Sequence, residues 1–381
     1  MDLKKNRWQP WLTALIFCIL IFGFTVVTLI KSPLEFSETE NRVLAQKPEI
    51  NPEAVMNGKF GAEYEEYLTD QFVFRDDWIG LKTSVEKLLL KRESKDIYFA
   101  EDGYFIEKHT GCFTTDMARR NITALTQFTE KYNEQFGTGH MTIMVIPNAV
   151  DILQDKLPPF AGPGGGMKYL EELAKALPED VWFDAASILN QHRDEELFYR
   201  TDHHWKTLAA FYVYQAWVKE QGYTFPNLGD YKIRTVTDDF QGTVQSKLGI
   251  QTAGDTIELF FSQNAGSYVV QKDDSIGYSI YNYAALDTKD KYAVYFGGNE
   301  AFLKIRTEKD NGRKILVIKD SYANCFIPFM LEEFQEIDVL DLRYTNERLS
   351  NLIEKGGYTD LLILYNVSGF AEDMSVMKFT N

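Results

Sequence analysis

The sequence predicts an α/β domain that is built on a parallel sheet and preceded by one membrane-spanning helix. Short unbroken apolar runs that end at a proline or a polar residue are typical of strands buried on both faces. Such runs occur at 141–146 (MTIMVI), 315–318 (ILVI) and 361–366 (LLILYN). They alternate with amphipathic helical stretches, which favours a sheet sandwiched by helices. The membrane helix is predicted from Trp11–Ile30, a run of 20 residues without a charge.

The N-terminal segment predicts where the protein resides. An α-helix rises ~1.5 Å per residue, so about 20 residues cross the hydrocarbon core of a bilayer. Lys4, Lys5 and Arg7 precede the apolar run, and Lys31 closes it. Basic residues before a first span predict a cytoplasmic tip, with everything after the span outside the cytoplasm. No small-residue cleavage pattern follows cleanly, so we expect an uncleaved, single-pass signal-anchor in the cell membrane.

Four segments are predicted along the chain. Residues 1–31 form the cytoplasmic tip and the transmembrane signal-anchor. Residues 32–57, polar and without a helical period, form an extended linker. Residues 58–95 form a helical segment with a break near Phe74, and residues 96–381 form the main domain.

The main domain is expected to start with a hairpin that turns at Asp102-Gly103. Helical periodicity predicts three helices, and a second short strand lies between the last two. These elements are 116–136, Met167–Leu177, VWFDA at 181–185 and Thr207–Gln221. Residues 227–300 differ, because short alternating runs rich in Thr, Tyr, Val, Gln and Gly predict a β-rich insertion.

Composition argues against one class of partner. The chain has 40 basic and 56 acidic residues, a net charge of −16. A nucleic-acid-binding protein needs a basic face to neutralise phosphate, so we expect no nucleic acid. An acidic body suits a neutral sugar or a cationic partner. Aromatic residues are abundant, with 21 Tyr and 27 Phe, but we expect those within 211–217 to lie in the core and not to form a sugar platform.

The three cysteines decide little. Cys18 lies within the predicted span. Cys112 and Cys325 could form one disulfide in an oxidising compartment, or could remain two buried thiols.

The stretch FYRTDHHWKTLAAF (198–211) places two of the five histidines side by side next to a carboxylate. In an extended segment, side chains two apart share a face, so Asp202 and His204 could pair while His203 points away. Such a pair could serve a catalytic relay. Asp and His are also ordinary zinc or iron ligands, but adjacent histidines seldom both reach one ion, so we expect no metal. A structural role, with Trp205 in the core and a histidine capping a helix, is the third interpretation.

A serine follows the predicted strand 314–318, in the turn Asp320-Ser321-Tyr322. Ligands of open α/β sheets bind in the crevice at the carboxyl ends of the strands, and a helix N-terminus there favours negative charge. Asn366 ends another strand at the same edge, where its amide could stabilise an oxyanion. Taken singly, these residues would be a helix cap and a turn residue. Together with the Asp/His pair they are the parts of a serine esterase or acyltransferase.

Several further motifs carry a resemblance to a known family. They are ENRVLAQKP (40–48), DQFVFRDDW (70–78), DGYFIEK (102–108), TIMVIPN (142–148), TDHHW (201–205), FQGTVQSKLG (240–249), YFGGNE (295–300), KDSYANCF (319–326) and LLILYN (361–366). The sequence resembles the DHHW protein family, which is itself similar to the SGNH-hydrolase-like domains of the alginate O-acetylation proteins. The resemblance implies an SGNH-like sheet with a permuted motif order, in which the Asp-x-His element precedes the serine.

The resemblance also implies an activity: transfer of acetyl groups to a cell-surface or secreted polysaccharide, with acetyl supplied by a membrane-bound O-acyltransferase. We expect no cofactor. It implies that Ser321 is the nucleophile, His204 the base, Asp202 its partner and Asn366 an oxyanion donor. Tyr322 and His203 would line the cleft.

The chain departs from the SGNH pattern in two places. Ordinary SGNH enzymes space the aspartate and histidine three apart, and here that position is Trp205. The loop DLRYTN (341–346) lacks the family's glycine, so Arg343 or a backbone N–H near it would replace it, with Gly298-Asn299 as a further lining segment.

Two other functions fit the same parts. A carbohydrate acetylesterase would use the same triad, and differs only in whether water or a sugar hydroxyl reaches the acyl-serine first. A non-catalytic member could bind glycan or scaffold an export complex. The presence of Ser, His, Asp and Asn favours an enzyme.

Overall fold

The computed structural model describes residues 8–37, 42–223, 226–273 and 275–380. The basic residues Lys4, Lys5 and Arg7, on which the topology prediction rests, lie outside the described residues. The chain divides into two compact units. Unit 1 contains the described residues up to Leu88 together with 246–250, and unit 2 contains the rest. The predicted four-segment division stays a prediction.

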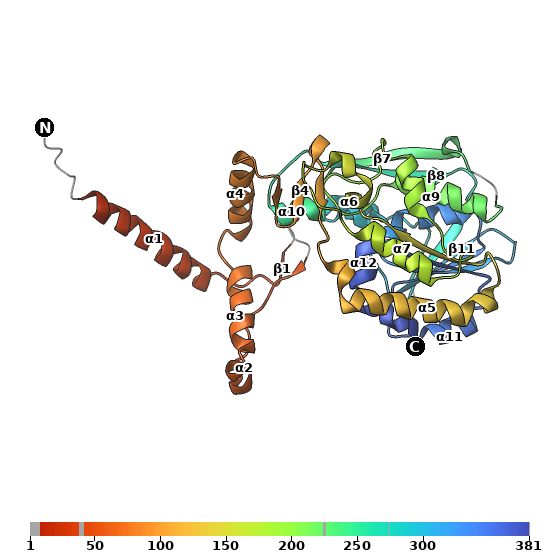
Figure 1. Ribbon diagram of the computed structural model, residues 1–381, viewed down its shortest axis with the longest axis horizontal. Helices are drawn as coiled ribbons and strands as arrows, with labels where there is room; N and C mark the ends of the chain where they lie inside the picture. Colours follow the sequence, from red (N-terminus) through yellow and green to blue (C-terminus); the bar gives the residue numbers. More distant parts are fainter. Residues whose placement is uncertain (1–7, 38–41, 224–225, 274, 381) are drawn as a thin grey trace. The chain divides into compact units, whose positions relative to one another are not determined.

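Unit 1 is largely helical (Figure 1). Its elements are α1 (Gln9–Ile30), β1 (Phe36–Ser37), β2 (Arg42–Val43), α2 (Pro52–Met56), α3 (Lys59–Asp70) and α4 (Arg75–Leu88). Within α1, Pro10–Ile30 has a mean hydropathy of 2.7 and no buried residue, so it is long and apolar enough to cross a membrane. The expected break near Phe74 is confirmed, because that residue takes a left-handed φ of 56° between α3 and α4.

The segment expected as an extended linker contains local structure. β1 and β2 pair antiparallel, and α2 follows. Arg42 donates two hydrogen bonds to the buried Asp70 at the end of α3, at 2.8 and 2.6 Å. The Ala45 N–H donates to the same carboxylate at 2.9 Å, so the segment is fastened to α3.

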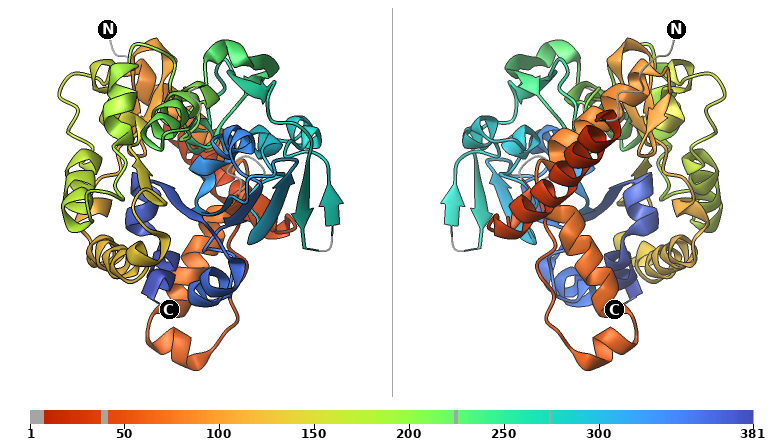
Figure 2. Two further views of the ribbon diagram at one scale, coloured as in Figure 1. Left: turned by 90° about the vertical axis from the view of Figure 1, so that its right-hand side faces the viewer. Right: turned by 90° about the vertical axis from the view of Figure 1, so that its left-hand side faces the viewer.

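Unit 2 is an α/β domain around a seven-stranded sheet, in the order β10-β9-β11-β13-β12-β14-β6 (Figures 1 and 2). The four parallel strands are β6 (Met141–Ile146), β12 (Lys314–Lys319), β13 (Glu336–Leu340) and β14 (Asp360–Asn366). Three antiparallel strands extend the sheet: β11 (Phe302–Thr307), β9 (Tyr268–Lys272) and β10 (Ser275–Gly277). The predicted fold class is therefore confirmed.

Alternation along the parallel strands builds a core on each face of the sheet. On β12, Ile315 and Val317 belong to one core, while Leu316 and Ile318 belong to the other. The second core includes residues of α5 (Asp116–Phe136), α7 (Gly166–Ala176), α11 (Leu349–Gly356) and α12 (Val367–Glu372). The first includes residues of α8 (Ala185–Gln191), α9 (Thr207–Glu220), β7 (Tyr231–Phe240) and β8 (Asp255–Ser262). Because both faces are covered, the central strands consist almost wholly of apolar residues.

The remaining elements are short. A three-stranded sheet contains β3 (Glu93–Ser94), β4 (Ile97–Phe99) and β5 (Phe105–Glu107), and β4 turns into β5 at Asp102-Gly103 as expected. α6 (Ala149–Ile152) follows β6, and α10 (Thr243–Leu248) joins β7 to β8. In the predicted β-rich insertion, β7 and β8 pair with each other, whereas β9 and β10 join the edge of the central sheet.

One predicted strand is wrong. VWFDA (181–185) makes only an isolated parallel bridge between Trp182 and Ile143. The reason is local: the Asp184 side chain accepts a hydrogen bond from the Ser187 N–H and starts α8 before a strand can extend. Cys112 and Cys325 are buried and free, so no disulfide joins them.

Candidate active site

The turn that follows β12 holds Ser321 at the carboxyl edge of the parallel strands. Ser321 begins the 3₁₀-helix η7 (Ser321–Cys325), and the preceding Asp320 is buried. The Asp320 carboxylate accepts from the Tyr322 N–H at 2.8 Å, and from the N–H and side-chain amide of Asn366 at 2.8 and 2.6 Å. Burial raises the pKa of Asp320, and these hydrogen bonds oppose the rise. The turn carrying the serine is thus fixed to the end of β14.

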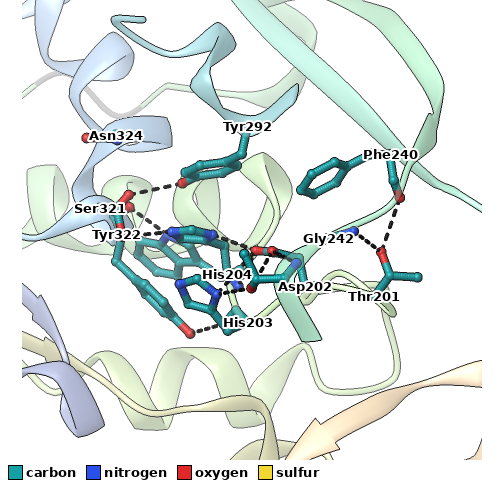
Figure 3. Close-up of polar contacts among 12 residues, drawn as sticks. Thr201, Asp202, His203, His204, Phe240, Gly242, Tyr292, Ser321, Tyr322 and Asn324 are labelled. Carbon is teal, nitrogen blue, oxygen red and sulfur yellow. Dashed lines mark hydrogen bonds and ion pairs between the residues drawn. The ribbon is translucent and has the colours of Figure 1, made fainter. Parts of the chain in front are cut away.

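His204 connects the serine to a carboxylate (Figure 3). Its Nε2 lies 2.8 Å from Ser321 Oγ, and its Nδ1 lies 2.6 Å from Asp202 Oδ1. Asp202 and His204 are both buried, whereas Ser321 is half-buried. A serine, a histidine and an aspartate in this chain have the arrangement of a general-base relay.

Gly242 and the first residue of α10, which follow β7, hold Asp202 in place. Thr243 donates to Asp202 Oδ2 from its N–H at 2.8 Å and from its hydroxyl at 3.0 Å. Gly242 allows this approach, because a Cβ on it would lie 2.2 Å from the Asp202 Cβ. Burial raises the pKa of Asp202, but the charges of His203 and His204 and the hydrogen bonds outweigh burial and lower it. Asp202 therefore remains a carboxylate.

The imidazole of His204 lies between two other rings. The Tyr292 ring stacks on it at 3.8 Å between centroids, with 14° between the planes, and the His203 ring lies 3.9 Å away on a tilt of 36°. The Tyr292 hydroxyl donates to the Ser321 carbonyl at 3.2 Å (Figure 3). Tyr292 comes from the 3₁₀-helix η6 (Lys291–Val294) and so links a third chain segment to the relay.

The expectation that His203 points away from His204 is wrong. The DHHW segment is a turn and not a strand, because the His204 N–H donates to Asp202 Oδ1 at 3.0 Å, which closes the chain on itself. His203 therefore lies beside its neighbour, with its Nδ1 2.8 Å from Thr243 Oγ1. The choice of His204 as the residue facing Ser321 agrees with the geometry, although strand alternation is not its cause.

Trp205 and Tyr322 form the support beneath the relay. Trp205 is fully buried and donates from Nε1 to the Tyr322 carbonyl at 2.8 Å. Tyr322 is also buried, and its hydroxyl donates to the His203 carbonyl at 2.5 Å. Tyr322 thus joins the serine turn to the DHHW segment and does not line an open cleft.

The remaining predicted site residues are held by other groups. Asn366 caps α12, where its Oδ1 accepts from the Gly369 N–H at 2.7 Å, and its amide donates to Asp320. The Arg343 guanidinium donates two hydrogen bonds to Asp341, at 2.9 and 2.6 Å. Asn299 Oδ1 accepts from the buried Lys319 at 2.8 Å, and Gly298 precedes it with a φ of 112°.

Three adjacent residues could in principle hold a cation, because Asp202, His203 and His204 each offer a ligand atom within 4.8 Å of the others. The donor set fits a metal poorly. Both nitrogens of His204 are already engaged, one by Asp202 and one by Ser321, and His203 Nδ1 faces Thr243. A metal at this place would have to replace the hydrogen bonds that build the relay.

Comparison with protein families decides the assignment. The model of the DHHW protein family matches residues 135–340, which is more than half of the chain. The chain belongs to the DHHW family. The resemblance drawn from the sequence motifs is therefore confirmed.

Three solved structures are similar to this DHHW protein. A DHHW family protein from Eubacterium siraeum is 24% identical, covers 76% of this chain and 96% of its own, and has a TM-score of 0.59. PatB1 from Bacillus cereus, solved with a sulfonyl adduct, is 21% identical, covers 75% and 100%, and has a TM-score of 0.61. The O-acetyltransferase domain of AlgJ from Pseudomonas putida is 11% identical, covers 73% and 94%, and has a TM-score of 0.46. No curated protein sequence matches the chain.

Two groups of residues that contact the relay of this DHHW protein were not predicted from its sequence. Gly242 and Thr243 lie within FQGTVQSKLG, one of the motifs that carried the family resemblance, so a signal for them was present. Tyr292 had no local signal, because it lies in a stretch interpreted as a β-rich insertion and reaches His204 only through the tertiary fold.

Proposed function

We propose that this DHHW protein is a membrane-anchored, extracytoplasmic O-acetyltransferase that modifies a cell-envelope or exported polysaccharide through an acyl-Ser321 intermediate. The hydrogen-bonded chain from Asp202 through His204 to Ser321 carries the proposal. Membership in the DHHW family supports the acetyl chemistry, because the resemblance implies it. α1 supports the location, because a helix of this length and hydropathy can anchor the protein at the membrane through which a glycan is exported.

In the first half of the reaction the acetyl group moves to the enzyme. Ser321 Oγ attacks the acetyl carbonyl of the donor while its proton passes to His204 Nε2. Asp202 accepts from His204 Nδ1 and stabilises the imidazolium. The bond from the carbonyl carbon to the donor oxygen then breaks, and His204 gives the proton to that oxygen. The products are an acetyl ester on Ser321 and the deacylated donor.

Stabilisation of the oxyanion needs hydrogen-bond donors close to Ser321. The Asn366 amide donates to Asp320 and the Arg343 guanidinium donates twice to Asp341, and each of these side chains has further N–H groups for the predicted role. The backbone N–H of Ser321 would be an additional donor, because it lies in the first turn of η7, where N–H groups have no partner within the helix.

In the second half a sugar hydroxyl is the nucleophile. It gives its proton to His204 Nε2 and attacks the acetyl-serine carbonyl. The ester bond to Ser321 breaks, and His204 returns the proton to Oγ. Water in place of the sugar would give an esterase, so access of the acceptor to the half-buried serine decides the outcome. The acetyl donor in this scheme is a membrane-bound O-acyltransferase. α1 would anchor this protein in the same membrane as that donor.

The test uses the full-length protein in detergent. An arylsulfonyl fluoride is expected to label Ser321, as found by peptide mass spectrometry, and 4-nitrophenyl acetate is expected to give a burst of nitrophenolate and an acetylated enzyme. Neutral oligosaccharides are then offered as acceptors, and mass spectrometry of the products is expected to find acetylated sugar. Failure of Ser321 to react with either reagent contradicts the serine mechanism. Acetyl release only to water, with every acceptor, contradicts the transferase and leaves an esterase.

A further inference from the structure

Helix α4 of unit 1 has two different faces. Gly80 and Thr83 lie on the packed face, where the Thr83 hydroxyl donates to the Leu248 carbonyl at 2.7 Å. A Cβ on Gly80 would lie 2.3 Å from the Gly249 carbonyl oxygen, so this contact admits no larger residue. The opposite face carries large apolar side chains at spacings of three and four, which align along one side of a helix. These residues, called the α4 stripe here, are Trp78, Leu81, Val85 and Leu88, with 42, 53, 44 and 81% of their surface exposed.

The first turn of α4 contacts the membrane helix itself. The Trp78 ring meets the Phe24 ring edge-on at 5.5 Å between centroids, and Phe72, just before α4, lies 6.3 Å from the same ring. The Val73 N–H donates to the Thr28 hydroxyl of α1 at 3.3 Å. Phe24 precedes the last residue of α1 by six positions, which is about 9 Å along a helix axis. The start of α4 therefore lies at the level of the last turns of α1 and not beyond its end.

We propose that the α4 stripe lies in the interfacial layer of the membrane that α1 crosses. This inference rests on the membrane anchoring in the proposed function, but not on its acyl chemistry. Helices that lie on a membrane bury their apolar face roughly 5–10 Å into the boundary between headgroups and acyl chains, which matches the level of Phe24. A tryptophan at that depth is typical, because its ring is apolar and its N–H is polar. Lys82, exposed beside the stripe, would face the headgroups.

The consequence is a second point of attachment. A single span leaves a protein free to turn about the membrane normal and to tilt, whereas an apolar helix in the plane of the membrane opposes tilting. Unit 1 would then keep a defined orientation at the membrane surface.

The test places the full-length protein in lipid nanodiscs, whose two faces are both open to solvent. The environment-sensitive dye NBD is attached at Val85→Cys in a Cys18→Ala background, since Cys112 and Cys325 are buried. Lys87→Cys in the same background is the matched control, because Lys87 is exposed and two residues turn the helix by about 200°, away from the stripe. Native Cys18, exposed within α1, is labelled in the wild type to report the span itself.

We expect nitroxide-bearing lipids to quench the dye at Cys18 and at position 85, and iodide to quench position 87 several-fold more than position 85. Equal iodide quenching at 85 and 87, with Cys18 still quenched by lipid, would overturn the proposal and leave the anchor intact. Protection of position 85 from both quenchers would show that protein covers the stripe, and would also overturn it. Iodide quenching at Cys18 would overturn the anchor and the inference together.

Discussion

Two buried polar clusters flank the turn after β12. One is enclosed by protein, and the other leads to a half-buried hydroxyl. On one side, Lys319 donates to Asn299 and Asn324 at 2.8 and 2.9 Å and lies 3.5 Å from Asp341. Lys319 and Asp341 are nearly or fully buried, so this cluster is closed. On the other side, the chain from Asp202 through His204 ends at the half-buried Ser321.

The contrast separates a structural polar cluster from one that, under the proposed function, is catalytic. Both clusters contain a buried carboxylate beside a basic side chain. In the closed cluster Lys319 is held by Asn299, Asn324 and Asp341, and none of these contacts offers a proton acceptor on a substrate. In the open cluster the last partner is the half-buried Ser321 hydroxyl, which the proposed function requires a substrate to reach. Variants on the two sides should therefore lose different properties.

The largest effect is expected from Ser321→Ala. Loss of the nucleophile should lower kcat for 4-nitrophenyl acetate by about 10⁴–10⁶-fold with the fold intact, as is typical when one member of a triad is removed. Ser368→Ala is the matched control, since Ser368 is a buried serine just after β14 whose hydroxyl donates to Asn366 Oδ1 at 2.9 Å. Steady-state kinetics and circular dichroism measure both. Near wild-type turnover in Ser321→Ala would disprove the acyl-serine route.

Substitutions of the two histidines should differ strongly in their effect on activity. His204→Gln should abolish the burst of nitrophenolate, because Nε2 is the base for Ser321. His203→Gln should cost less than about tenfold, because the nitrogen that faces Ser321 belongs to His204, whereas the Nδ1 of His203 faces Thr243. Burst kinetics of the two folded variants measure the difference. Equal, complete losses accompanied by stoichiometric zinc or iron in the wild type would favour a metal site instead.

Lys319→Met should act on stability and not on the proton relay. Removing one partner of a buried ion pair typically costs about 3–5 kcal/mol, and we expect the lower end because Arg343 still pairs with Asp341. Denaturant unfolding of the detergent-solubilised protein measures the loss. Activity per folded molecule should change much less than in the histidine variant, and a loss of turnover without a loss of stability would contradict the closed-cluster interpretation.

The two clusters should also respond to opposite ends of the pH range. Burial lowers the pKa of Lys319 to about 8, although Asp341 opposes the shift. Between that value and about 10.4 the unfolded chain binds more protons than the folded chain, so the free energy of unfolding should rise with pH in this range relative to Lys319→Met.

Asp202 gives the opposite case. Its folded pKa is lowered below the ordinary value of about 3.9, so its contribution is present above that pH and is lost in acid, as pH falls through the folded pKa. Unfolding of wild type, Lys319→Met and Asp202→Asn across pH measures both. Parallel curves for the three proteins would contradict these assignments.

Ser321 could be selected from the sequence because an apolar strand, a short turn and a polar group follow one another at 314–322, and the structure keeps this order. Its role as the nucleophile stays a prediction. Asn366 was placed correctly at the end of its strand, but its role as an oxyanion donor does not follow from that place. A side-chain amide at a strand end competes for the nearest backbone groups, and here it caps α12 and binds Asp320.

Other parts of the site could not be predicted. The closeness of His203 and His204 depends on a turn that a carboxylate closes on a neighbouring N–H, which strand alternation does not anticipate. Tyr292 arrives from a 3₁₀-helix about 30 residues before the serine, and only packing decides that its ring covers His204. The predicted strand VWFDA does not form, because its residue Asp184 caps the start of α8.

The bond between Asp320 and the end of β14 has a mechanical consequence. Ser321 is carried by β12, yet its turn is fastened to Asn366 of the neighbouring strand, and the Asp320 N–H also donates to the Leu364 carbonyl at 3.2 Å. Any sliding of β12 against β14 would therefore move Oγ relative to the imidazole, whose position comes from a separate loop. A change elsewhere in the sheet that loosens the β12–β14 pair should therefore lower the proposed activity before the domain unfolds.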